Sequence, residues 1–313
     1  MSATATSVPR RRRTAWYFFL LALASLMWAA QGTAVKILDR SMGPIAITFV
    51  PFYITTLLFV PLLLTSKANN HSSRRPSASD WVKFTIAGVA GQVLAQLGMT
   101  WGISRSLASN GAILNLLIPV ISAVLASLML KERLTLLRIA SLLIGLIGVV
   151  LMSVSDWRQA SFGQMHFLLG NVLILGGCLG SSFYNVYCKG LMQRFSEIEI
   201  LIFSYITASL ASLPLLIWVE PFSFRTFLQF DWQSWAAFAF LALFMYGASM
   251  LLFFKVLQHL DVTTASASLY LVPVFGVFLA AVLLGERLNV ISIAGAVVVL
   301  AATLLIMRYD TSY

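Results

Sequence analysis

The residues best suited to chemistry are amides, hydroxyls and aromatic rings that occur within long apolar segments of the sequence. Gln92 and Gln96 are one helical turn apart and share a face, as do Tyr184 and Tyr187 in a later segment. A hydrogen bond between two helices explains any one of these side chains, but the set, spread over several helices, predicts a polar, aromatic-lined cavity. The candidates for that cavity are Trp28, Gln31, Gln92, Gln96, Asn110, Asn115, Tyr184, Asn185, Tyr187, Tyr246, Ser249 and Tyr270.

The chemistry of such a cavity is limited by the charges that it lacks. None of the Asp and Glu residues falls in the middle of an apolar segment. An exporter of lipophilic cations, or a proton-coupled carrier of the usual type, needs a carboxylate at that depth. The sequence therefore favours small neutral or zwitterionic solutes, such as amino acids, held by amides, hydroxyls and aromatic faces.

An intramembrane enzyme is the alternative from a different functional class. It would need a metal site, a pair of catalytic carboxylates, or a serine beside a histidine. The three histidines, His71, His166 and His259, lie in a connector and at two segment ends, so we do not expect them to converge. We therefore expect no enzymatic activity, no metal site and no cofactor.

The composition of the 313 residues indicates the class of protein to which these polar groups belong. Apolar residues make up 59% and charged residues 10% of the chain, against about 45–50% and about 25% in soluble domains. A membrane-spanning helix takes about 20 apolar residues. We predict an all-α polytopic membrane protein with about ten transmembrane helices. The predicted segments are 16–36, 45–65, 81–102, 107–130, 136–153, 165–188, 197–217, 232–254, 263–284 and 289–307.

The basic residues predict the orientation of the chain. With the N-terminus inside, 15 of the 21 Lys and Arg residues fall on the cytoplasmic side, as the positive-inside rule requires. We expect both termini in the cytoplasm, and residues 1–15 to form a basic tail at the plasma membrane. Anionic lipid headgroups would contact Arg10, Arg11, Arg12 and Arg13 in this tail. The net charge of +10 is then explained without nucleic acid.

An internal repeat divides the chain into two halves. Residues 116–134 and 270–288 are identical at nine of 19 positions, with an offset of 154 residues. The halves cover residues 16–153 and 165–308, and each holds five predicted spans. Because five is odd, the second half would enter the membrane upside down relative to the first.

The two copies read LLIPVISAVLASLMLKERL and YLVPVFGVFLAAVLLGERL, each with a mid-helix proline and a closing Glu-Arg-Leu. In these motifs and its two five-helix halves, the chain resembles the EamA-type branch of the drug/metabolite transporter superfamily. The resemblance implies a secondary transporter, an exporter or exchanger that works by alternating access. It also implies a cavity among the first, third, fourth, sixth, eighth and ninth helices. A lipid-carrier flippase subunit, or a scaffold that transports nothing, is the alternative on the same fold.

Pro119 and Pro273 are predicted to kink their helices, because a proline removes one backbone hydrogen bond and clashes with the carbonyl four residues earlier. Those carbonyls belong to Asn115 and Leu269. At membrane depth such a carbonyl needs a partner or a water-filled cavity. We interpret the two prolines as gating kinks beside the cavity. A kink that only improves packing is the alternative.

Glu132-Arg133 and Glu286-Arg287 are interpreted as structural corners between consecutive helices. Each Glu would accept from the exposed amides of the next helix, and each Arg would face the last carbonyls of the previous one. Thr135 would be an N-cap. These positions lie at the membrane surfaces, which argues against contact with the substrate.

Glycines at GxxxG spacing mark places where two helices can approach closely. They occur as Gly98 with Gly102 and as Gly176 with Gly180. We interpret them as packing within the chain, and a homodimer stays open as a second use of the motif.

Overall fold

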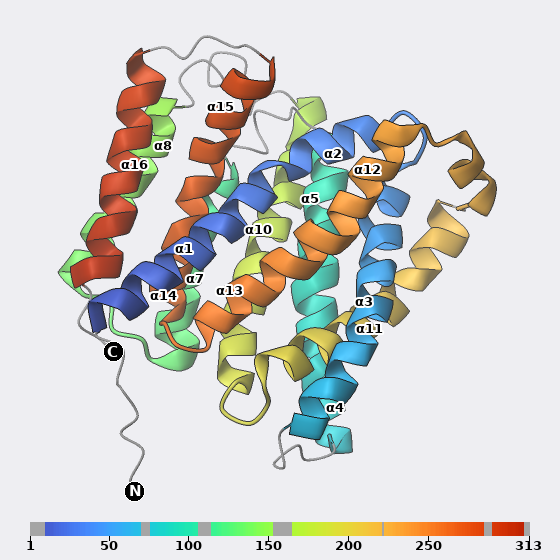
Figure 1. Ribbon diagram of the computed structural model, residues 1–313, viewed down its shortest axis with the longest axis horizontal. Helices are drawn as coiled ribbons and strands as arrows, with labels where there is room; N and C mark the ends of the chain where they lie inside the picture. The colour runs from blue at the N-terminus through green and yellow to red at the C-terminus, as the bar shows by residue number, and fades with distance from the viewer. Residues whose placement is uncertain are drawn as a thin grey trace, which may run out of the picture.

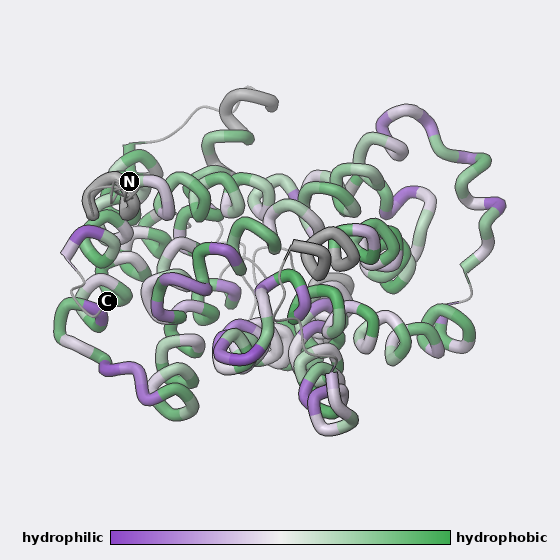
Figure 2. Tube along the Cα trace, turned by 60° about the horizontal axis from the view of Figure 1, so that its bottom comes forward, coloured by the Kyte–Doolittle hydropathy of each residue, from purple (hydrophilic) through white to green (hydrophobic). Residues whose placement is uncertain are grey.

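The computed structural model describes residues 10–69, 76–105, 114–152, 165–220, 222–284 and 290–309 (Figure 1). Every regular element within these ranges is a helix. Six helices are long and apolar enough to cross a membrane, and four shorter apolar helices accompany them. Each of these overlaps one of the predicted segments, so the all-helical prediction is confirmed. Long stretches of helix are apolar, and hydrophilic residues gather mainly at helix ends and connections (Figure 2).

Several of the membrane-spanning units are composite, because one helical segment runs directly into another. Among the described residues, the first half contains α1 (Arg10–Ala29), α2 (Gln31–Leu38), α3 (Pro44–Asn69), α4 (Ala78–Ile86), η1 (Ala87–Val93), α5 (Leu94–Ser104), α7 (Leu117–Leu130) and α8 (Leu136–Met152). The second half consists of α10 (Met165–Leu191), α11 (Glu197–Pro214), η2 (Leu215–Val219), η3 (Phe224–Gln229), α12 (Trp232–Phe240), η4 (Leu241–Ala248), α13 (Ser249–Leu257), α14 (Val262–Ala267), η5 (Ser268–Tyr270), α15 (Leu271–Leu284) and α16 (Val290–Tyr309).

Short polar motifs fix where helices begin. At the start of α4, the Ser77 hydroxyl accepts from the Asp80 amide (3.3 Å) and the Asp80 carboxylate accepts from the Ser77 amide (3.1 Å). The start of α11 has the same capping box. Asp231 caps α12 by accepting from the Ser234 amide (2.8 Å), and this bond lowers the pKa of the Asp231 carboxyl.

The repeat is visible in the helical geometry. A π-helical segment interrupts the third span at η1, and another interrupts the eighth span at η4. They begin at Ala87 and Leu241, which are separated by the same 154 residues as the sequence repeat. Such widened turns are uncommon and often occur at functional sites. Equivalent spans of the two halves therefore share a local distortion that the sequence alignment alone does not predict.

Glycines allow α5 and α10 to pack backbone to backbone. A Cβ atom added at Gly98 would lie 2.6 Å from the Gly177 amide nitrogen, and one added at Gly180 would lie 2.6 Å from the Ala95 nitrogen. Gly102 is also in close backbone contact with α10, whereas a Cβ at Gly176 would meet only a leucine methyl at 4.0 Å. Three of the four predicted glycines thus pack within the chain, and Gly177 rather than Gly176 completes the contact.

α1 begins, and α16 finishes, at the same end of the helical bundle (Figure 1). α8 and α16, which are the last helices of the two halves, pack side by side at one edge. This arrangement leaves the interior to the remaining spans.

Candidate functional site

A cavity of about 160 Å³ lies among spans from both halves of the chain. Its walls combine amides, aromatic rings and methionines, and none of the lining residues carries a charge. The lining residues are Trp28, Gln31, Gln92, Ala95, Gln96, Met99, Asn115, Ile118, Ser181, Tyr184, Asn185, Tyr205, Met245, Tyr246, Met250 and Leu269.

The two halves contribute equivalent positions to this cavity. Half of its lining residues form pairs separated by the 154-residue offset of the repeat. These pairs are Gln31 with Asn185, Gln92 with Tyr246, Gln96 with Met250, and Asn115 with Leu269. Gln92 and Tyr246 lie in the two π-helical segments. The cavity therefore lies where the repeated halves meet. Equivalent positions of the two halves carry different side chains in its wall.

Eight of the predicted cavity residues line this single cavity. They are Trp28, Gln31, Gln92, Gln96, Asn115, Tyr184, Asn185 and Tyr246. Three others lie elsewhere: Tyr187 stacks on Phe183, the Ser249 hydroxyl donates to the Met245 carbonyl, and the Tyr270 ring packs against Gly145. Asn110 lies outside the described residues.

Hydrogen bonds hold the polar walls in place. The Gln96 Nε2 donates to the Gln92 Oε1 (3.3 Å), which sets the orientation of both amides. The Tyr205 hydroxyl donates to the Tyr246 carbonyl (3.0 Å), within the π-helical segment η4. The Tyr184 hydroxyl is 2.9 Å from the Ser204 Oγ on α11.

Sequence reasoning missed half of the lining residues. Tyr205 comes from the seventh span, which the family resemblance does not place around the cavity. Nothing in the sequence marks Met99, Met245 and Met250 as cavity residues, because methionine in an apolar helix ordinarily fills gaps in the core. Ser181 could have been found, since it is one turn before Asn185 on the same face of α10.

Each of the two predicted prolines follows a short interruption of the α-helical pattern within its span. Pro119 is the third residue of α7, after a turn at Leu116, and Pro273 is the third residue of α15, after the 3₁₀ turn η5. Each proline lacks the amide that would bond to the carbonyl of Asn115 or Leu269, so the helical hydrogen-bond pattern is interrupted just before it. The chain thus breaks before each proline, and the preceding residues Asn115 and Leu269 line the cavity.

Side chains from neighbouring helices bond to the backbone at these breaks. The Ser182 hydroxyl on α10 donates to the Ile118 carbonyl (3.1 Å), and the Cys178 thiol lies 3.5 Å from the Leu114 carbonyl. At the other break, the Ser25 hydroxyl on α1 donates to the Ser268 carbonyl (3.1 Å). Polar side chains therefore stabilise the interrupted backbone inside the bundle.

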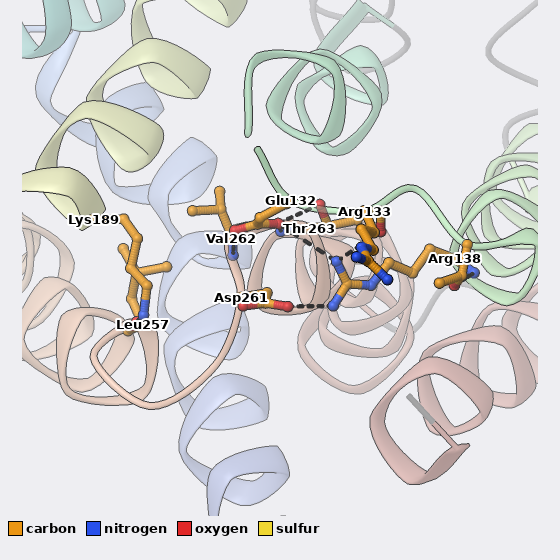
Figure 3. Close-up of polar contacts among 9 residues, drawn as sticks. Glu132, Arg133, Arg138, Lys189, Leu257, Asp261, Val262 and Thr263 are labelled. Atoms are coloured by element: carbon orange, nitrogen blue, oxygen red, sulfur yellow. Dashed lines mark hydrogen bonds and ion pairs between the residues drawn. The ribbon is translucent and has the colours of Figure 1, made fainter. Parts of the chain in front are cut away.

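A charged cluster joins the end of α7 to the starts of α8 and α14 (Figure 3). The Glu132 carboxylate accepts from the Val262 amide (2.7 Å), and from the amide (3.1 Å) and hydroxyl (2.7 Å) of Thr263. It therefore caps α14, in the other half of the chain, rather than the next helix α8 as we predicted. The fully buried guanidinium of Arg138 pairs with Asp261 and lies 3.8 Å from Glu132.

The other predicted corner residues behave differently. Arg133 is exposed, and its backbone carbonyl accepts from the Arg138 guanidinium (3.1 Å). Thr135 caps α8 as predicted, because its hydroxyl accepts from the Arg138 amide (3.3 Å). Glu286 and Arg287 lie outside the described residues. The Lys189 Nζ donates to the Leu257 carbonyl (2.7 Å) at the end of α13 (Figure 3).

The family follows from a comparison with known sequences. The profile of the EamA-like transporter family matches the chain twice, over residues 15–154 and 168–308. The chain belongs to the EamA-like transporter family. It is thus a multi-pass membrane protein of a family of transporters within the drug/metabolite transporter superfamily.

Relatives of known name agree with this assignment along nearly their whole length. An "Uncharacterized transporter" of Archaeoglobus fulgidus is 25% identical, over 93% of this chain and 98% of its own. A "Probable terminal-alkyne amino-acid exporter" of Streptantibioticus cattleyicolor is 24% identical, over 92% of each chain. An "S-adenosylmethionine uptake transporter" of Rickettsia conorii is 23% identical, over 93% and 91%.

A solved crystal structure has the same fold. It superposes with a TM-score of 0.77 at 17% sequence identity, over 95% of this chain and 99% of its own. At this identity the likeness concerns the arrangement of helices alone.

Proposed function

We propose that this EamA-family member is a secondary transporter of small neutral or zwitterionic metabolites such as amino acids. The observation that carries the proposal is the uncharged cavity built from equivalent positions of both halves. Sites at the interface of internal repeats are typical of secondary transporters.

The lining chemistry suits a zwitterion with an apolar or polarizable side chain. The amides of Gln31, Gln92 and Gln96 offer both donors and acceptors, so they can bind a carboxylate and an ammonium group together. Methionines and aromatic rings form the rest of the wall and can pack against an apolar side chain. The relative named as an amino-acid exporter supports this substrate class.

We further propose that the halves, residues 16–153 and 165–308, have inverted topology and rock about the cavity, with both termini in the cytoplasm of a plasma-membrane protein. The distribution of Lys and Arg supports this orientation. The position of the start of α1 and the finish of α16 at one end of the bundle also supports it. Arg10 to Arg13 would then contact anionic headgroups of the inner leaflet.

In this scheme the backbone changes conformation at the helix interruptions before Pro119 and Pro273. Each break lies beside the cavity and at an equivalent position of its half. A change of backbone conformation there would move the following helix and open one end of the cavity. We propose export or exchange as the direction, which the relative named as an exporter supports.

Transport in sealed proteoliposomes tests the proposal. Vesicles loaded with an unlabelled amino acid should take up the same amino acid in labelled form from outside. An excess of the unlabelled amino acid outside should abolish uptake of the label. Vesicles containing the Gln92→Ala, Gln96→Ala double variant, at equal protein content, are the matched control. No movement of any amino acid, with transfer of a lipid-linked substrate between leaflets instead, would favour a flippase and contradict the proposal.

A further inference from the structure

The two π-helical segments receive hydrogen bonds from hydroxyls that belong to the other half of the chain. The Thr207 hydroxyl on α11 donates to the Phe84 carbonyl (2.9 Å), in the last turn of α4 before η1. The Thr55 hydroxyl on α3 donates to the Ala242 carbonyl (2.6 Å) within η4. Each π-helical segment is therefore bonded, in itself or at its entry, to the second span of the opposite half.

These contacts follow the internal repeat. α3 and α11 are the second spans of the two halves, and they pack against each other on the side of the bundle away from α8 and α16 (Figure 1). Ala242, which accepts from Thr55, corresponds to Gly88 by the 154-residue offset. A Cβ atom added at Gly88 would lie 2.6 Å from the Ser204 carbonyl oxygen on α11. Both π-helical segments thus contact the opposite second span at equivalent positions.

Tyr205 adds a third hydroxyl contact, to η4. Its hydroxyl donates to the Tyr246 carbonyl (3.0 Å), and the centre of its ring lies 4.3 Å from that of Phe52 on α3. The Phe52 ring in turn meets the Tyr246 ring edge to face, with 5.4 Å between the ring centres. Tyr205 and Phe52 are fully buried. The hydrogen bond and the ring contacts together restrict the η4 backbone at Tyr246, whose side chain lines the cavity.

The π-helical form determines which side chains face the cavity. A π turn contains about one residue more than an α turn. At 3.6 residues per turn, one extra residue rotates the side chains beyond it by about 100° relative to a continuous α-helix. Gln92 lies within η1 and Gln96 just after it, and Tyr246 and Met250 have the same places at η4. All four line the cavity, so a regular α-helix in either span would change its wall.

The hydroxyls act on the backbone that carries these side chains. A side chain that bonds into the hydrogen-bond ladder is a known cause of a distorted helix. Thr55 and Thr207 also lie within bonding distance of carbonyls of their own helices, 3.0 Å from Pro51 and 2.9 Å from Ser204, so each hydroxyl joins two spans. Neither threonine is among the lining residues.

We propose that Thr55, Tyr205 and Thr207 are positioning residues of the cavity. Their hydroxyls keep η1 and η4 in the π-helical form that directs the lining side chains toward the substrate. Through them the second span of each half sets the shape of the wall contributed by the other half. The link to the substrate rests on the proposed function, whereas the stabilisation of the backbone does not.

Hydrogen–deuterium exchange tests the stabilisation of the backbone without any substrate. The full-length protein in lipid nanodiscs is exchanged, and peptides that cover η1 and η4 are measured by mass spectrometry. Loss of one hydrogen bond should raise local opening, and with it the exchange rate, about 2- to 10-fold. Thr207→Val should do so in η1 and leave η4 unchanged, whereas Thr55→Val should do so in η4 and leave η1 unchanged.

Thr303→Val is the matched control, because the buried Thr303 hydroxyl donates to the Val299 carbonyl of its own helix, α16 (2.9 Å). It should change the exchange of neither segment. Tyr205→Phe removes one oxygen atom and keeps the ring, so it tests η4 even if the threonine variants do not fold. Wild-type exchange of η4 in Tyr205→Phe, or of η1 in a folded Thr207→Val protein, would overturn the proposal.

Transport kinetics in proteoliposomes test the link to the substrate. For an amino acid carried by the wild type, Thr207→Val should raise KM several-fold with a smaller change in the maximal rate, and Thr207→Ser, which keeps the hydroxyl, should restore KM. An unchanged KM in a Thr207→Val protein whose η1 exchanges faster would overturn the positioning role. A wild type that carries no amino acid would contradict the proposed function alone, because the exchange experiment contains no substrate.

Discussion

Arg138 and Asp261 form an ion pair although they are 123 positions apart in the chain. Arg138 belongs to the first half and Asp261 to the second, and Glu132 from the first half caps α14 of the second. The guanidinium side chain is fully buried, whereas 27% of the Asp261 side chain is exposed. Charged side chains from both halves thus link the two halves at one end of the bundle.

Removal of the Arg138 guanidinium should destabilise the protein. Arg138→Ala leaves two carboxylates close together without their buried cation, and breaking a buried pair costs about 3–5 kcal/mol. Because Asp261 is partly exposed, we expect the lower end, about 3 kcal/mol. Chemical unfolding in detergent measures the change. Arg133→Ala, an exposed neighbour, should change stability by no more than about 0.5 kcal/mol. Equal stabilities of the two variants would contradict a structural role for the buried pair.

Close packing of α5 on α10 should not tolerate a side chain at Gly98. Gly98→Ala places a methyl group 2.6 Å from backbone atoms of α10, so the helices must separate. We expect a loss of about 1–3 kcal/mol, as for other overpacked sites. Gly276→Ala is the control, because nothing lies within 4 Å of a Cβ there. Thermal unfolding of the two variants checks this difference, and an unchanged melting temperature for Gly98→Ala would show that the contact is looser than described.

Replacing both Pro119 and Pro273 by alanine should slow transport. Alanine at Pro119 and Pro273 restores an amide that can bond to the carbonyl of Asn115 or Leu269, so the helix becomes continuous. The initial rate of exchange in proteoliposomes should fall. Pro44→Ala is the control, because Pro44 is the first residue of α3 and its amide has no helical acceptor. A double variant that transports at the wild-type rate would contradict a gating role and leave the two prolines with a role in packing only.

Much of the fold could be predicted because hydrophobic length and the internal repeat are properties of the sequence itself. The same reasoning found Gln92, Gln96 and Asn185, because a side-chain amide in a membrane-spanning helix normally faces the interior of the bundle. The predicted boundaries of the two halves, and the sidedness of the termini, stay predictions.

Other features depend on contacts between distant segments. Arg138 is one basic residue among 21 in the sequence, and nothing local to it predicts Asp261 as its partner. Glu132 was assigned to the wrong helix because its neighbour in sequence, α8, is not the helix whose amides it meets. Tyr205 was missed since a tyrosine in an apolar span resembles an ordinary core residue until the cavity is seen.

Amino-acid binding by wild-type protein and by Gln92→Ala tests the central claim most directly. Loss of one hydrogen bond to a charged group costs about 1.5–3 kcal/mol, so the dissociation constant of an amino acid carried by the wild type should rise about 10-fold or more. Tyr187→Phe, outside the cavity, should bind as the wild type does. Wild-type affinity in Gln92→Ala, or an equal loss in Tyr187→Phe, would contradict the account of this cavity as the substrate site.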